Sequence, residues 1–297
     1  MTMPPIAFPA DGPVSVHIEL QSGYVAIVTS PRDDVLVTVT PSNSRRAGDR
    51  AAAEQIQVDQ KGPRISVTGR SRWNPFGASD CVDILIEAPE GSAVTAHVKY
   101  GSLQVTGPVG EVQAKVDYGD ASIEASARLE LRGGHGDMRI GRVEGDAQIT
   151  LSSGAIRIGH VGQGLRIKGG HGSVDVGTVG GHADIATAGA IELGTAGAEL
   201  SVRSAYGGVR VRDLVRGAAR IEASYGAVHL GVRKGTAVWL DASSQHGAVR
   251  SDLASDPGPA TDEEALKLRV NTTYGDIIIQ RSAVHAVPIP QSEGANS

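Results

Sequence analysis

The sequence is poor in several features that define common protein classes. Among its 297 residues it has a single cysteine, Cys81, and only 3% aromatic residues. One cysteine excludes an intramolecular disulfide framework. The 28 basic residues are outnumbered by 33 acidic ones, which argues against a general nucleic-acid binder. No apolar run approaches the ~18 residues that a membrane-spanning helix needs, so we expect no membrane span.

The N-terminal segment Met1–Pro13 holds no lysine or arginine and only a short apolar stretch. It therefore does not match a secretory signal peptide, and we expect a cytoplasmic protein. What the sequence has in excess is glycine, with 39 residues, or roughly 13% against a usual ~7%.

A tripeptide of ring residue, glycine and small or acidic residue recurs, as in Tyr118-Gly119-Asp120 and His171-Gly172-Ser173. Two degenerate copies, Ser153-Gly154 and Ala188-Gly189, fill gaps in the series. Seven of the nine steps between successive glycines are 17 to 19 residues, and the last two are 21 and 28. This near-constant step indicates an internal repeat. The repeat glycines are Gly101, Gly119, Gly136, Gly154, Gly172, Gly189, Gly207, Gly226, Gly247 and Gly275.

Each copy has the pattern of two short strands. After the glycine, apolar and polar residues alternate, as in Ile156-Arg157-Ile158. Before it, Ala147 and Ile149 alternate with polar residues in the same way. This period of two is typical of strands with one buried face. Such a small unit cannot bury its own apolar face, so successive copies must stack.

Two topologies fit a unit of about 18 residues: a parallel solenoid with one rung per unit, and an antiparallel meander of hairpins. The same residue type holds the same slot in successive units, which favours the solenoid. A left-handed hexapeptide helix is disfavoured because alternation continues unbroken over 146–152. We predict an all-β fold: a parallel, single-stranded β-helix-like solenoid of about ten rungs. Leu131, Ile149 and Ile167 should form one buried ladder.

Residues 14–92 are strand-like but lack the 18-residue step, and we interpret them as an irregular N-terminal β cap with one short helix within 45–55. Residues 93–282 hold the solenoid repeats, interrupted by a loop insertion at 251–264. Residues 283–297, with a polar end after Pro290, should form a disordered tail.

The repeated Tyr-Gly-Asp/Ser units resemble the β-strand-repeat "putative adhesin" domain of unknown function found in many bacteria. Three stretches, 237–241, 246–253 and 273–279, are similar to cytosolic actinobacterial members. The resemblance covers roughly residues 14–282 and implies a β-solenoid. It implies no catalytic residues, and the family's label does not establish a function.

The histidines and glycine motifs do not predict a metal site. His135 and His171 hold the same slot two units apart, about 9.6 Å at ~4.8 Å per rung, which is too far for one transition metal. Gly133-Gly134-His135-Gly136-Asp137 is similar to a calcium-binding nonapeptide, but its sixth position is Met138 rather than aspartate. We expect no metal and no cofactor.

Acidic residues are too scattered to predict a catalytic pair. Asp175 and Glu192 should be neighbours in one outward ladder, but basic residues flank them and favour a salt-bridge stripe. That ladder is Arg139, Arg157, Asp175, Glu192 and Arg210. A lone cysteine such as Cys81 is more often a small core residue than a nucleophile. We predict no catalytic residue, and a polysaccharide-active β-helix enzyme is the least favoured alternative.

The sequence therefore predicts a non-enzymatic repeat protein for protein–protein interaction or scaffolding, with a cell-surface adhesin-like protein as the alternative. Ile278 marks the predicted interaction end, because every earlier unit has a polar residue in that outward slot. The last rung should also leave an unpaired strand edge. Three covers for this end are open: the tail from Ser282 onward, the loop at 251–264, or another chain. The partner is then an unknown protein or a second copy that associates through the C-terminal end.

Overall fold

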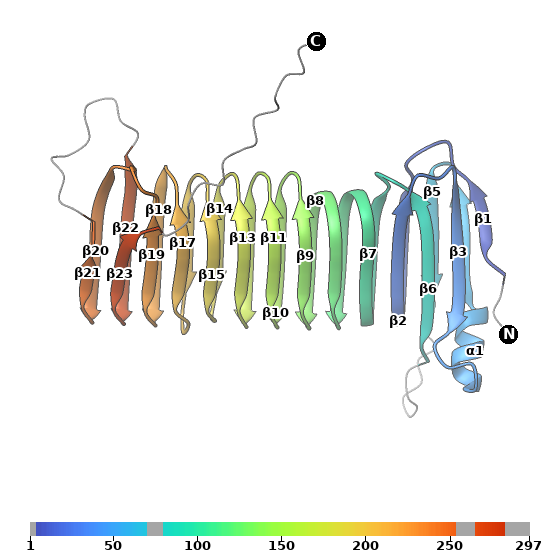
Figure 1. The fold of residues 1–297 in the computed structure, drawn as a ribbon. Helices are drawn as coiled ribbons and strands as arrows, with labels where there is room; N and C mark the ends of the chain where they lie inside the picture. Colours follow the sequence, from blue (N-terminus) through green and yellow to red (C-terminus); the bar gives the residue numbers. More distant parts are fainter. Residues whose placement is uncertain (1–3, 70–79, 254–264, 283–297) are drawn as a thin grey trace, which may run out of the picture.

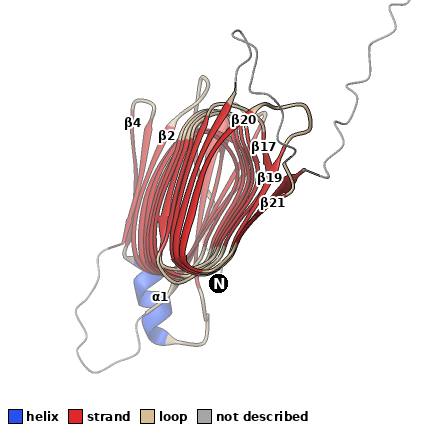
Figure 2. Ribbon diagram, turned by 90° about the vertical axis from the view of Figure 1, so that its left-hand side faces the viewer, coloured by secondary structure: helices blue, strands red, loops and turns tan. Residues whose placement is uncertain are grey.

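The computed structural model describes residues 4–69, 80–253 and 265–282. Its strands join into one sheet that winds around a narrow interior as a long coil (Figure 1 and Figure 2). A rung consists of a first strand, a glycine corner, a second strand and a second corner. For example, β12 (Leu165–His171) is followed by Gly172 and then by β13 (Val174–Val179).

Each strand pairs in parallel with the corresponding strands of the rungs before and after it. β12 pairs with β10 (Ala147–Ser153) and with β14 (Ala183–Thr187), which confirms the predicted parallel solenoid. The other strands of the regular repeats are β7 (Ala93–Tyr118), β8 (Ala121–His135), β9 (Met138–Val143), β11 (Ile156–Val161), β15 (Ile191–Ala196), β16 (Leu200–Ser204), β17 (Val209–Leu214), β18 (Ala218–Tyr225) and β19 (Val228–Val232).

The predicted core ladder is present. Ile149 lies opposite Leu131 on one side and Ile167 on the other, and all three side chains are buried. Ile185 continues this ladder although the glycine of its rung comes one residue early. Compared with the preceding rung, one residue is therefore missing between Ile185 and Gly189, at the ring position, and β14 keeps its register.

The repeat begins earlier than its 18-residue step indicates. β2 (Ser15–Ser30) pairs in parallel with β7, with Gly23 opposite Gly101, so it forms a complete rung. On its other side, β2 pairs in parallel with β5 (Arg64–Gly69) and β6 (Val82–Pro89), which together form one more rung. The segment after β2 thus returns to the outer side of β2, and the chain then crosses back to continue with β7 (Figure 1).

Antiparallel strands and one helix cover this end of the solenoid. β3 (Asp34–Pro41) pairs with β6, β4 (Ile56–Lys61) with β5, and β1 (Ile6–Pro9) with β3. The helix α1 (Ala47–Glu54) lies in the segment where a short helix was predicted.

The other end also departs from chain order. β22 (Leu266–Tyr274) lies between β18 and β20 (Val238–His246), and β23 (Ile277–Arg281) lies between β19 and β21 (Val249–Ser251). The last rung in sequence is therefore internal, and β20 and β21 form the terminal rung (Figure 1).

The prediction that Ile278 lies at the open end is consequently wrong. Ile278 pairs with His229 on one side and with Arg250 on the other. The predicted loop insertion lies almost entirely, and the predicted tail entirely, outside the described residues. Within the described ranges, no helix is long and apolar enough to cross a membrane.

Candidate interaction surfaces

The terminal rung leaves part of the hydrophobic core uncovered. In the neighbouring rung, the core-facing Leu268 and Ile277 are fully buried. Their partners in the terminal rung are Leu240, which is only partly buried, and Val249, which is 44% exposed. The core positions therefore continue to the edge of the sheet but lack a covering layer there. We call β20 and β21 the open end.

The opposite end of the solenoid is closed. Val35 and Val37 of β3 are fully buried. Phe8, Ile56 and Val58 of the antiparallel cap strands pack against the same core. Within the described residues, the parallel rungs therefore end uncovered at β20 and β21, whereas the opposite end carries antiparallel cap strands, of which the outer strand β1 has Ile6 44% exposed.

A groove of 490 Å³ lies on the outer face beside the open end. Trp239, one of only two tryptophans in the chain, lies at one end of it and is 53% exposed. Lys267 is the cross-strand partner of Trp239, and Ala218 is the next partner of Lys267. The groove continues past Glu199 to the opposite wall. Sequence analysis missed this groove, because the order of the terminal rungs determines which residues are neighbours.

Ring side chains form two stacks along the corner that precedes the repeat glycines. The first stack is Tyr100, Tyr118 and His135, with ring centroids 5.2 and 5.3 Å apart. The second is Tyr206, Tyr225, Tyr274 and His246, with centroids 4.6 to 5.9 Å apart. These separations are typical of stacked aromatic side chains.

The stacks show that ring residues of successive repeats pack on one another at this corner. His135 and His171 are separated by the rung of Ser153, as the repeat predicted. Among the described residues, no group of three His, Cys, Asp or Glu side chains is arranged to hold a metal ion.

The predicted outward charge ladder is present in the expected register, but its ion pairs are different. Arg157 lies opposite Asp175, yet its guanidinium is 3.6 Å from Asp137. Glu192 is paired with Arg212 rather than Arg210. The hydrogen bond from Arg212 lowers the pKa of the Glu192 carboxyl below its ordinary value. Glu192 is therefore engaged by a guanidinium group in a diagonal contact, whereas Asp175 forms no salt bridge among the described residues.

Asp137 is the most connected of these acids. It accepts a hydrogen bond of 3.0 Å from the backbone N–H of Ala155, in the corner of the next rung. That hydrogen bond, together with the charges of Arg139 and Arg157, lowers the pKa of the Asp137 carboxyl. The carboxylate thus links two adjacent rungs at their glycine corners.

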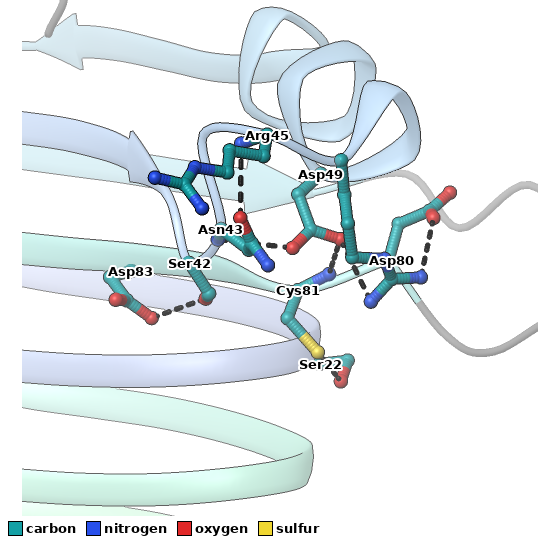
Figure 3. A network of polar contacts seen from close by, with 9 residues as sticks. Ser22, Ser42, Asn43, Arg45, Asp49, Asp80, Cys81 and Asp83 are labelled. Carbon is teal, nitrogen blue, oxygen red and sulfur yellow. Dashed lines mark hydrogen bonds and ion pairs between the residues drawn. The ribbon is translucent and has the colours of Figure 1, made fainter.

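The single cysteine belongs to a polar network between α1 and the strands (Figure 3). Asp49, which is 1% exposed, accepts hydrogen bonds from the backbone N–H groups of Asn43 and Cys81 and is 3.3 Å from Arg46. The Cys81 Sγ lies 3.1 Å from the Ser22 hydroxyl. This arrangement connects the helix to β2 and to the segment before β6, and it supports a structural role for these residues.

Comparison with known proteins gives one family match. The family model described as Toastrack DUF4097 matches residues 15–285. A search of the curated proteins finds no match.

Several solved structures are similar at low sequence identity. A putative adhesin from Parabacteroides merdae ATCC 43184 is 11% identical, with 92% of this chain and 95% of that chain covered and a TM-score of 0.38. A putative adhesin from Bacteroides fragilis NCTC 9343 is 12% identical, with coverage of 93% and 95% and a TM-score of 0.29. A putative lipid binding protein from Parabacteroides distasonis ATCC 8503 is 11% identical, with coverage of 94% and 96% and a TM-score of 0.30. These likenesses are too distant to inform function.

Proposed function

The chain belongs to the Toastrack DUF4097 family, and from this premise we propose that it is a β-solenoid scaffold that pairs with a second copy of itself through the open end. The family resemblance predicted from the repeat is confirmed, while the similarity to actinobacterial members stays a prediction. The observation that carries the proposal is the terminal rung, where Val249 is 44% exposed although its partner Ile277 is fully buried.

An edge of this kind attracts another strand for two reasons. Among the described residues, β20 and β21 pair with a strand on one side only, so the N–H and C=O groups along their other side can bind a further strand. The uncovered core positions Val238, Leu240 and Val249 would also lose contact with water if a layer were added. Binding at this end therefore combines backbone hydrogen bonds with apolar burial.

The closed opposite end determines what kind of assembly can form. If both ends were open, copies could stack head to tail into a filament. Phe8 and the cap strands cover the core at one end, where β1 and β4 each pair on one side only among the described residues. The parallel rungs themselves end uncovered at β20 and β21, which favours open end against open end. That contact is isologous and closes as a dimer with two-fold symmetry.

The charges on the open end are compatible with such a contact. β20 carries Asp241 and β21 carries Arg250, both on the outer face. Asp241 is 3.1 Å from Arg269 and Arg250 is 3.2 Å from Asp276 in the same chain, so neither presents an unpaired charge to a second copy. A two-fold axis along the strand direction would place β20 antiparallel to β21 of the partner.

The test is the molar mass of the full chain in solution as a function of concentration. We expect a dimer that dissociates in Val249→Lys, because an inward-pointing lysine blocks edge pairing. Ile278→Lys is the matched control, since this residue lies in an internal strand, and it should leave the dimer intact.

A wild-type monomer at all concentrations would refute the proposed pairing. A truncation after Ser282 separates the other occupants of the end: if the wild type is a monomer and the truncated chain a dimer, the tail covers the open end. Dimerisation that persists in Val249→Lys would place the contact elsewhere.

We also propose that this scaffold acts in the cytoplasm and by binding rather than by catalysis. The scattered acids, of which Asp137 and Glu192 are engaged by guanidinium groups, support binding over catalysis. The adhesin-like alternative requires the protein on the cell surface. Fractionation of the native cell, with surface labelling of intact cells, distinguishes the two locations.

A further inference from the structure

The groove beside the open end extends over five neighbouring rungs, whose first strands are β14, β16, β18, β22 and β20. At ~4.8 Å per rung, this corresponds to roughly 19 Å along the solenoid axis. The groove has a volume of 490 Å³, and all five rungs contribute lining residues. It is therefore long enough for an extended ligand.

One ladder of the groove presents a donor and an acceptor to the same space. Lys267 and Glu199 lie on either side of Ala218, two rungs or about 9.6 Å apart. That separation is too large for an ion pair, and within the described part of the chain neither side chain forms a salt bridge. Ala218 between them leaves the space above the sheet empty, so both groups are available to a ligand.

The second ladder adds charges of both signs. Arg220 and Asp184 lie on either side of Ser201. Arg220 is 2.6 Å from Glu222, and Asp184 is 3.6 Å from Arg203, so these groups are held in place by neighbours outside the groove. Basic residues therefore line the part of the groove near Trp239, and acidic residues line the far part.

This distribution excludes most ligand classes. An anionic ligand that filled the groove would lie against Asp184 and Glu199, and a cationic ligand would lie against Lys267 and Arg220. A lipid chain would remove water from all of these charges without replacing their hydrogen bonds. A neutral molecule with many hydroxyl groups can bond both the basic and the acidic side chains of the groove, because each hydroxyl both donates and accepts a hydrogen bond.

We propose that this groove binds a neutral oligosaccharide. The exposed indole of Trp239 packs against the C–H face of one sugar ring, and hydroxyls of the neighbouring sugar are bonded by Lys267 and Glu199. An aromatic ring that is apolar on its face and exposed to solvent suits such a contact. The site does not depend on pairing at the open end, because these side chains point outward from the face and the pairing uses the strand edge.

Tryptophan fluorescence gives a direct test. Trp73→Phe leaves Trp239 as the only indole, and this chain is titrated separately with cellotetraose, maltotetraose and tetra-N-acetylchitotetraose. We expect a saturable change in emission with at least one of the three. Lys267→Ala and Glu199→Ala should each weaken that binding about tenfold or more, since each removes a hydrogen bond to a charged group. Calorimetry on Trp239→Ala should show no binding.

Lys168→Ala is the matched control, because this lysine also faces outward on the same sheet but lies outside the groove. It should bind like the parent chain, and all variants should keep the parent's thermal midpoint. The proposal is refuted if none of the three sugars changes the emission, if the three groove variants bind like the parent, or if a heparin tetrasaccharide binds in their place. A dimer without sugar binding refutes this site alone, and sugar binding by a monomer refutes only the pairing.

Discussion

The corner between the two strands of a rung has no room for a side chain. Gly154 adopts a φ of +133°, where residues other than glycine are strained. A Cβ atom at this position would also lie 1.9 Å from the carbonyl oxygen of Gly136, in the corner of the preceding rung. Glycine is therefore needed both for the conformation of one corner and for the close stacking of successive corners.

These two requirements can be separated by mutation. Gly154→Ala should lower the free energy of unfolding by about 4 kcal/mol or more, because strain and a backbone clash combine. Gly12→Ala is the control: its φ is +137°, but no atom lies within 4 Å of the added Cβ. It should lose only about 1–3 kcal/mol from strain. Urea unfolding measures both, and equal losses would show that stacking of the corners contributes nothing.

The core ladder predicts a large difference between adjacent residues of β10. Ile149 is fully buried between Leu131 and Ile167, so Ile149→Asp would bury a charge without a partner. We expect a loss of about 4 kcal/mol or more, or failure to fold. Thr150 faces outward between Arg132 and Lys168, and Thr150→Asp should change stability by less than about 1 kcal/mol. Similar losses in thermal unfolding of both variants would show that the strand register is wrong.

The hydrogen bond between Asp137 and the next rung predicts a dependence on pH. The pKa of the Asp137 carboxyl is lowered in the folded state. The carboxylate therefore contributes to stability above the ordinary carboxyl pKa of ~3.9, and this contribution is lost as the pH falls through the lowered pKa of the folded state. Asp137→Asn should therefore lower the thermal midpoint at pH 7, and the difference from wild type should shrink as the pH falls below the ordinary carboxyl pKa.

Asp175→Asn is the control for this measurement. In the described part of the chain, Asp175 forms no salt bridge. It also faces outward, on β13, two rungs after the rung of Asp137. Its substitution should change the midpoint little at either pH. An Asp137→Asn variant with the same deficit at pH 7 and pH 3 would show that its carboxylate charge has no role.

At the scale of strands, both ends of the solenoid interrupt the order of the chain. β2 lies inside the stack although it comes early in sequence, and β22 with β23 lies inside although it comes last. The outer rung of β5 and β6 follows β2 in sequence, and the outer rung of β20 and β21 precedes β22 and β23. The 18-residue step cannot show this, because it indicates which residues share a slot but not which rungs are adjacent.

Hydrogen exchange on the full chain tests this order. The amides of β22 and β23 should be strongly protected, since each strand pairs on both sides, whereas β20 and β21 should exchange faster at their open edge. β12 serves as the fully paired reference. Stronger protection of β20 and β21 than of β22 and β23 would show that the rungs follow chain order.

The parts of this fold that the sequence predicts are those with local periodicity. Alternation predicts the buried ladder of Ile149, and the constant step predicts parallel stacking. The rung of β2 escaped because Gly23 lies 78 residues before Gly101, its partner in the next rung, instead of about 18. The open end and the groove of Trp239 escaped for a related reason: both depend on contacts between rungs whose adjacency no local pattern encodes.

At the scale of the whole molecule, the solenoid is a rod with one closed and one open end. Twelve rungs at ~4.8 Å each give roughly 50–60 Å of length, to which the cap strands add. The cap covers the end formed by the N-terminal segment, whereas β20 and β21, which precede the last two strands in sequence, form the open end. The proposed pairing edge and the proposed groove therefore share the rung of β20, and the groove continues from there to the rung of β14.

The shape of the dimer in solution provides the sharpest test of the whole arrangement. If open end meets open end, the two rods are collinear, and the maximum dimension from small-angle scattering should be nearly twice that of the monomer. The monomeric reference is Val249→Lys, which keeps the same fold but blocks the edge. A dimer that is no longer than this monomer would have its rods side by side, with contact through an outer face such as the stacked tyrosines, and the open end would then have no part in assembly.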